Sequence, residues 1–256
     1  MAKVGSNYVF NRTKEFACES SESATIKGVA GKTILLLAVT IITGIMSIMM
    51  TDVNELIALG TISIGYFLSP FITLVLSLIM SFKPNTAKIL AVPYAIFEGL
   101  AIGSLGIIMI ASLGMAEAGL ILGLALLITV AIFMGGGILY TSGKITVTTR
   151  FRRIMFVLLI GTSISTATIA IIGIFNPAVY MLFFGNSSLA LLISIIMVIV
   201  ASIYTVISFD NANSIVSAGL DKNYEWYASF GIILNVIWLF YEVLRLLLII
   251  LSRSRD

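Results

Sequence analysis

Long apolar runs separated by short polar connections make up most of this chain. The runs lie at about residues 33–50, 57–80, 89–113, 118–140, 154–175, 189–209 and 227–251. Each has roughly the 20 residues that an α-helix needs to cross a hydrocarbon core of about 30 Å. Because the connections are short, the helices should be neighbours. The pattern therefore predicts an all-α polytopic membrane protein with a bundle of seven transmembrane helices.

The chain before the first run is polar, with five basic and three acidic residues. A signal peptide would place its apolar region close to the N-terminus, so residues 1–32 are predicted to be a cytoplasmic tail. Residues 33–256 would then form a single transmembrane domain. The stretch SNYVFNRTKEF, residues 6–16, is predicted to form a short amphipathic helix on the inner membrane surface.

Lysine and arginine counts predict the orientation. The tail holds five, and the six connections that follow hold none, two, none, four, none and one. Loops rich in Lys and Arg stay in the cytoplasm, so the N-terminus should be cytoplasmic and the protein should lie in the cell membrane. Seven full crossings place Arg253 and Arg255 outside, against the same rule. Either these late charges are too few to matter, or the last segment is re-entrant. We favour a full crossing, because residues 227–251 are long enough for one.

Composition narrows the function. The chain is 59% hydrophobic and 11% charged, has one cysteine, Cys18, and has no histidine. Zinc sites with histidine and Ser-His or Cys-His dyads are therefore excluded, and we expect no enzyme, no catalytic residue and no cofactor. The basic residues flank apolar runs, which indicates membrane topology and no nucleic-acid partner. The lipid bilayer is the first partner that the sequence predicts. Within it, Gly99 and Gly103 are expected to let helices pack closely.

Five polar residues in or beside the apolar runs carry the candidate chemistry. They are Glu98, Asp210, Asn235, Glu242 and Arg245. An ionisable group at membrane depth costs roughly 2.5 to 17 kcal/mol, so such residues usually line a path or a bundle interior. Glu98 is either a neutral group that donates one hydrogen bond or the partner of a charge such as Arg245. These residues are the candidates for a gate or an ion pathway.

Asp210 directly follows the sixth apolar run, yet no proline or glycine interrupts the chain before Gly219. If the helix continues, Asp210 lies about two turns from its end, with amide and hydroxyl groups beside it. Such oxygen atoms suit a hydrated cation, which makes Asp210 the candidate Ca²⁺ ligand, although no firm metal site follows from the sequence. The alternative is a helix that ends at Asp210 and leaves the carboxylate in water.

In the last run, Asn235, Trp238, Glu242 and Arg245 are spaced by three, four and three residues and share one helix face. Glu242 and Arg245 can pair within the helix, and that pair is either purely structural or part of the pathway. We expect this face to look toward Asp210 and Glu98.

Four segments carry a resemblance to a known family. They are FEGLAIG, SGKITVTTRFRR, SFDNANSIV, and EWYASFG followed by VIWLFYEVLRLL. In these the chain resembles the Bax inhibitor-1/YccA family, in particular a bacterial branch with a long N-terminal tail. The resemblance runs from about residue 5 to the end. It implies a seven-helix fold with a central last helix and a pH-sensitive calcium leak.

The best-described members of that family carry an aspartate on each of the last two helices, which share a hydrogen bond. Asp210 matches the first aspartate, but the second aligns with Asn235, which cannot ionise. The two-aspartate switch is therefore absent as such. Either Glu242 serves as the second carboxylate, or the gate has lost its response to pH.

Two functions follow as hypotheses. The first is a cation leak channel or exchanger, with Ca²⁺ or H⁺ as the transported or sensed ion, carboxylates as the gate and Arg245 as an internal counter-cation. The second is a non-conducting regulator that binds another membrane protein, such as a quality-control protease, through its N-terminal tail.

Overall fold

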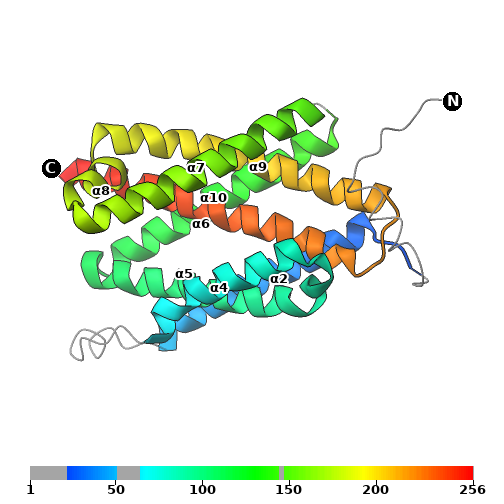
Figure 1. Ribbon diagram of the computed structural model, residues 1–256. Coiled ribbons are helices and arrows are strands. Elements are labelled where there is room, and N and C mark those ends of the chain that lie inside the picture. The colour runs from blue at the N-terminus through cyan, green and yellow to red at the C-terminus, as the bar shows by residue number, and fades with distance from the viewer. Residues whose placement is uncertain (1–21, 51–63, 144–146, 256) are drawn as a thin grey trace. The chain divides into compact units, whose positions relative to one another are not determined.

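The computed structural model describes residues 22–50, 64–143 and 147–255, and these residues are helical with no strand. Figure 1 shows the helices in chain order. They are α2 (Ile26–Met50), α4 (Ile64–Phe82), the 3₁₀ turn η1 (Pro84–Thr86), α5 (Ala87–Leu113), α6 (Met115–Thr141), α7 (Thr149–Phe175), α8 (Pro177–Phe184), α9 (Ser188–Ser217) and α10 (Tyr224–Arg255). The all-α prediction is confirmed. The amphipathic helix expected at residues 6–16 lies outside the described residues.

Each of the seven apolar runs has its helix. Among the described residues, α2, α5 with η1, α6, α7, α9 and α10 are long and apolar enough to cross a membrane, and a shorter apolar segment, Leu68–Phe82, lies in α4. The sequence did not predict α8, which starts at Pro177. Asn176 caps this helix, because its Oδ1 accepts a hydrogen bond from the Ala178 amide at 3.2 Å. A polytopic membrane protein is therefore confirmed.

The first helix begins at Ile26, whereas the apolar run predicted a start at residue 33. Thr25 lies just before the helix, and its hydroxyl accepts a hydrogen bond from the Gly28 amide at 3.0 Å, as an N-cap residue does. The two lysines that follow do not end the helix, because one of them, Lys32, has a carboxylate partner. The polar start of α2 is thus part of the folded structure.

The chain forms two compact units, which we describe separately. Unit 1 contains the described residues up to Gly114 together with Asn211–Ile233, and unit 2 contains Met115–Asp210 and the chain from Leu234 onward. In unit 1, α5 packs against both α2 and α4, which lie beside it in Figure 1.

Glycines set the contact between α2 and α5, as the sequence predicted. A Cβ atom at Gly99 would lie 1.8 Å from Thr43 Oγ1 and 2.4 Å from the Thr40 carbonyl oxygen. A Cβ atom at Gly103 would lie 2.8 Å from the Gly44 carbonyl oxygen. Only residues without a side chain let two backbones approach so closely, which is how small residues act in membrane helix interfaces.

The last helix of the chain runs unbroken over 32 residues. Within unit 2, Arg255 pairs with Glu117 at the start of α6, and Arg253 donates a hydrogen bond to Ser188 at the start of α9 at 3.2 Å. α10 is long and apolar enough to cross a membrane, and the structure shows no break in it.

We expect Gly99→Ala to destabilise the protein by about 1 to 3 kcal/mol, because the backbone oxygen of Thr40 cannot move away from the new methyl group. Thermal unfolding in detergent would measure the loss as a lower midpoint. Gly119→Ala is the matched control, since no atom lies within 4 Å of its Cβ position, and its midpoint should stay or rise. Equal midpoints for the two variants would contradict close packing at Gly99.

Candidate functional site

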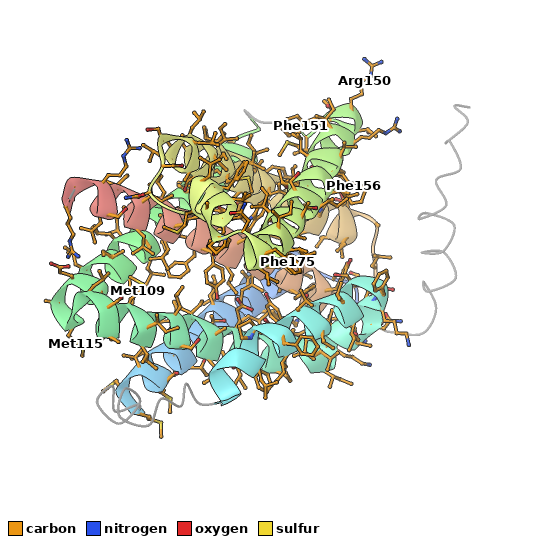
Figure 2. All side chains as sticks on the ribbon, turned by 60° about the vertical axis from the view of Figure 1, so that its left-hand side comes forward. Met109, Met115, Arg150, Phe151, Phe156 and Phe175 are labelled. Atoms are coloured by element: carbon orange, nitrogen blue, oxygen red, sulfur yellow. The ribbon has the colours of Figure 1, made fainter. Side chains whose placement is uncertain are left out.

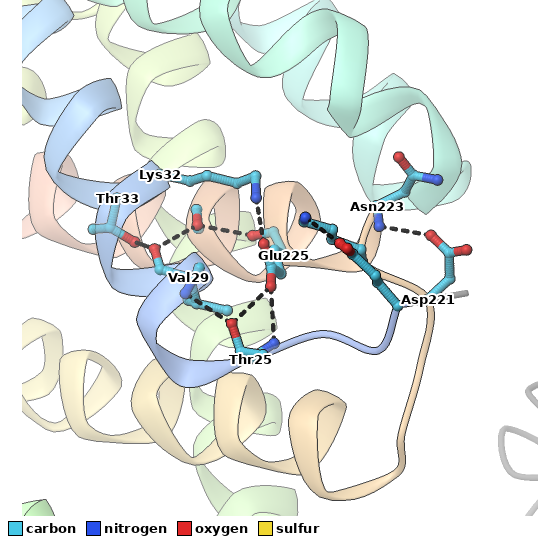
Figure 3. A network of polar contacts seen from close by, with 11 residues as sticks. Thr25, Val29, Lys32, Thr33, Asp221, Asn223 and Glu225 are labelled. Carbon is cyan, nitrogen blue, oxygen red and sulfur yellow. Dashed lines mark hydrogen bonds and ion pairs between the residues drawn. The ribbon is translucent and has the colours of Figure 1, made fainter. Parts of the chain in front are cut away.

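A buried carboxylate joins the two chain segments that form unit 1. Glu225, in the first turn of α10, is 1% exposed, and Oε1 accepts hydrogen bonds from the Thr25 amide at 2.8 Å and the Thr25 hydroxyl at 3.0 Å. Its other oxygen pairs with Lys32 of α2. Figure 3 shows this network, which we call the N-terminal clasp and define as Thr25, Lys32 and Glu225. It holds the start of α2 beside the start of α10.

Backbone bonds extend the clasp toward the tail. The Ala24 amide donates to the Leu220 carbonyl at 2.8 Å, and the Lys222 amide donates to the Glu22 carbonyl at 3.2 Å. Ser23 and Asp221 form an isolated antiparallel bridge. The side chains of Glu22 and Lys222 also pair, and this hydrogen bond raises the pKa of Lys222 above its ordinary value. Residues 22–25 therefore lie along the connection between α9 and α10.

Glu225 was not among the candidates that the sequence predicted. Its position is a weak indication of a site, since an acidic residue in the first turn of a helix is common and favourable on its own. Lys32 offered a second signal, because a lysine inside an apolar helix needs a partner. The Lys32 ammonium also lies 5.3 Å from the centre of the Trp226 ring, in cation–π geometry. Gly28 completes the fit, because a Cβ atom there would lie 2.2 Å from the Glu225 carboxyl group.

Asp210 lies inside α9, which continues to Ser217, so the prediction of a continuing helix is confirmed. The helix stops before Gly219, whose φ of +64° belongs to the left-handed region. The Tyr140 hydroxyl of α6 donates to Asp210 Oδ1 at 3.2 Å, and Arg152 of α7 pairs with Oδ2. Three helices of unit 2 therefore meet at this carboxylate.

An apolar layer adjoins Asp210 on the same helices. Met155, Tyr204 and Ile207 are buried together, and the Tyr204 hydroxyl donates to the Met155 carbonyl. The Tyr204 ring lies 5.5 Å from the ring of Trp238 on α10. This aromatic layer, defined as Met155, Tyr204, Ile207 and Trp238, connects α7, α9 and α10. Trp238, on the polar face of α10, therefore contacts the helix that carries Asp210.

A second charge pair lies on α10 within unit 2. Glu242 Oε1 accepts a hydrogen bond from Trp238 at 3.2 Å, and Oε2 lies 3.8 Å from Arg245 Nη1. Arg245 also donates to the Phe183 carbonyl of the α8 region at 2.7 Å, and its guanidinium lies 4.6 Å from the centre of the Phe184 ring. The predicted pair within the helix is therefore present, and α8 supplies further partners for the arginine.

Helix geometry gives the order of these groups along α9 and α10. The short connection between them makes α9 and α10 antiparallel, with Tyr204 and Trp238 at the same level. At a rise of about 1.5 Å per residue, Asp210 lies about 9 Å from this level and Glu242 about 6 Å away in the opposite direction. The two carboxylates are thus about 15 Å apart along the helices, with the aromatic layer between them.

Asn235 lies on the Asp210 side of the aromatic layer, about 4 to 5 Å from the level of Asp210 by the same reasoning. Glu98 belongs to unit 1, where it is 6% exposed in the middle of α5. The structure thus places four of the five candidate residues in unit 2: Asp210, Asn235, Glu242 and Arg245. Among the described residues, no three Cys, Asp or Glu side chains gather as a metal site.

Six helices long and apolar enough to cross a membrane, among the described residues, define a polytopic membrane protein. The chain belongs to the Bax inhibitor 1 like family, whose sequence profile matches residues 7–252. The resemblance drawn from the sequence is therefore confirmed. Comparison with curated proteins and with solved structures gave no match.

Replacing Glu225 by Gln should destabilise the protein by about 1 to 3 kcal/mol, because Lys32 then loses the buried partner of its charge. Chemical or thermal unfolding in detergent would show this loss. Glu117→Gln removes a carboxylate whose ion pair is about half exposed, and surface pairs contribute only about 0 to 1 kcal/mol. If both variants unfold alike, the clasp does not stabilise unit 1.

Proposed function

We propose that the protein is a cation leak channel or exchanger, with Ca²⁺ as the favoured ion, and that the described conformation is closed. The observation that carries the proposal is the pairing of Asp210 on α9 with Arg152 on α7 within unit 2. A carboxylate that could hold a cation is occupied by an internal cation. An incoming ion would have to displace the arginine, which gives a closed state without histidine.

The burial of the pair supports a competition of this kind. The Asp210 side chain is 19% exposed and the Arg152 side chain 43% exposed, so the arginine is the less enclosed partner and the one that can move away. Tyr140 would keep Asp210 oriented after the arginine leaves. Oxygen ligands of this type suit Ca²⁺, and water would complete the shell.

The aromatic layer would act as the second barrier. Apolar constrictions gate channels because water leaves them readily. Asp210 with Asn235 on one side of the layer and Glu242 with Arg245 on the other would then form two polar half-sites. Their estimated separation of about 15 Å is too large for one shared proton, so we assign Glu242 and Asp210 separate roles. Glu98 is a further polar element, in unit 1.

Arg152→Gln should raise the Ca²⁺ leak by about tenfold, since a hydrogen bond between charged groups is worth about 1.5 to 3 kcal/mol and solvent screening of the 43% exposed arginine keeps the value at the lower end. Asp210→Asn should lower the leak and abolish the increase in the double variant. The measurement is calcium entry into proteoliposomes that contain a trapped indicator, at about pH 6 and about pH 8. Glu242→Gln should lower the leak without removing the effect of Arg152→Gln.

Arg153→Gln is the matched control, because Arg153 is the exposed neighbour of Arg152 on the same helix turn and has no ion pair among the described residues. Its leak should equal that of the wild type. A protein that shows no leak in any variant would contradict the channel proposal. An equal rise in the Ca²⁺ leak for Arg152→Gln and Arg153→Gln would contradict the proposal that the Arg152–Asp210 pair keeps the channel closed.

The alternative function is a non-conducting regulator that binds another membrane protein, such as a quality-control protease, through its N-terminal tail. The N-terminal clasp favours it, because residues 22–25 connect the tail to the start of α10. A partner that pulls on the tail would act directly on the helix that carries Glu242.

Removal of residues 1–21 separates the two functions, since it leaves the N-terminal clasp intact. If the protein is a regulator, this truncated chain should fail to rescue a strain that lacks the protein, whereas Asp210→Asn should rescue it. If it is a channel gated at Asp210, the results should be the reverse. Thermal unfolding of the truncated chain should match the wild type, which confirms that the clasp is preserved.

A further inference from the structure

Three arginines lie among the first five residues of α7. They are Arg150, Arg152 and Arg153, and the first turn of the helix holds no acidic residue. The sequence has no Asp or Glu between Glu117 and Asp210, so α7 and the connections on either side of it carry no carboxylate. Arg152 pairs with Asp210, whereas Arg150 and Arg153 are exposed and take part in none of the described ion pairs.

Helical spacing separates the arginines into two faces. Arg152 and Met155 are three residues apart on the inward face, where they contact α9. Arg150 and Arg153 are also three residues apart, on the outward face, and Figure 2 shows Arg150 extending away from the end of α7. Arg152 belongs to the proposed gate, whereas Arg150 and Arg153 have no role in that gate.

An apolar column continues from the outward pair along α7. Ile154 follows Arg150 by four residues and is 59% exposed, and Val157 follows Arg153 by four residues and is 64% exposed. In a helix that crosses a membrane, exposed aliphatic residues face lipid chains. The two arginines therefore lie where this hydrocarbon-facing column meets the headgroup layer.

The charge distribution calls for an anion at this place. Cations in the first turn of a helix are disfavoured by the helix dipole, and two neighbouring guanidinium groups repel each other. Arginine forms bidentate hydrogen bonds with phosphate, and basic residues beside a membrane helix attract anionic lipids. We propose that the phosphate of an anionic phospholipid binds Arg150 and Arg153, with its acyl chains along Ile154 and Val157.

The shared chemistry is a phosphate group, which a free anion could also provide. The column of exposed aliphatic residues favours the lipid, because a soluble phosphate would use the arginines alone. Without Ile154 and Val157, the two arginines would bind a phospholipid and a free phosphate equally well.

Native mass spectrometry of the purified full chain tests the proposal by counting bound phosphatidylglycerol as lipid is titrated. Because each basic residue contributes about fivefold, Arg150→Gln/Arg153→Gln should weaken binding by about 30-fold. Lys83→Gln/Lys88→Gln is the matched control, since it removes two exposed charges near the start of α5 that cannot form bidentate bonds with phosphate, and it should weaken binding far less. The readout is lipid binding, so it does not depend on ion flux.

Three further arms complete the test. Phosphatidylcholine should bind far less than phosphatidylglycerol, and inorganic phosphate or glycerol 3-phosphate in excess should not displace the bound lipid. Val157→Ser should weaken lipid binding while both arginines remain. Equal losses for the arginine and lysine variants, equal binding of the two lipids, or full displacement by soluble phosphate would overturn the proposal.

Discussion

An ionisable side chain inside a membrane helix is costly unless another group compensates its charge. This constraint organises the described chain. Glu225 pairs with Lys32, Asp210 with Arg152, and Glu242 with Arg245. In the first two pairs the partner comes from a different helix, so charge compensation also decides which helices must lie together. The third pair shares one helix and recruits α8 through the Phe183 carbonyl.

Pairs of this kind differ in how firmly they are held. Glu225 is 1% exposed and has three donors around it, which suits a fixed connection between the start of α2 and the start of α10. Arg152 is 43% exposed and keeps its partner at the end of a long side chain, which suits a contact that can open. The same chemistry therefore serves as a fixed clasp in unit 1 and, in our account, as a latch in unit 2.

The helices followed from the sequence because apolar runs of about 20 residues have few alternatives to a membrane helix. The family followed from the four segments that resemble it. Spacing also predicted the Glu242–Arg245 pair and the close approach at Gly99, since both depend on local geometry. Partners from distant segments could not be predicted. Asp210 and Arg152 are separated by 58 residues, and Thr25 and Glu225 by 200, so no pattern within one helix reveals them.

Two boundaries also show the limit of a hydropathy pattern. The first helix starts at Ile26 because Thr25 caps it and Glu225 compensates Lys32, neither of which is an apolar signal. The last helix continues to Arg255, beyond the apolar run that ends at residue 251, and Arg255 pairs there with Glu117 of α6. In both cases a polar contact between distant residues outweighs the local sequence.

Calcium binding at Asp210 is the central claim, and infrared difference spectroscopy of the carboxylates tests it most directly. Addition of Ca²⁺ to the purified protein should shift a carboxylate band that is absent from the Asp210→Asn protein. In Arg152→Gln the same shift should appear at lower calcium concentration, because the competing cation is gone. A calcium-induced band that persists unchanged in Asp210→Asn would contradict the account.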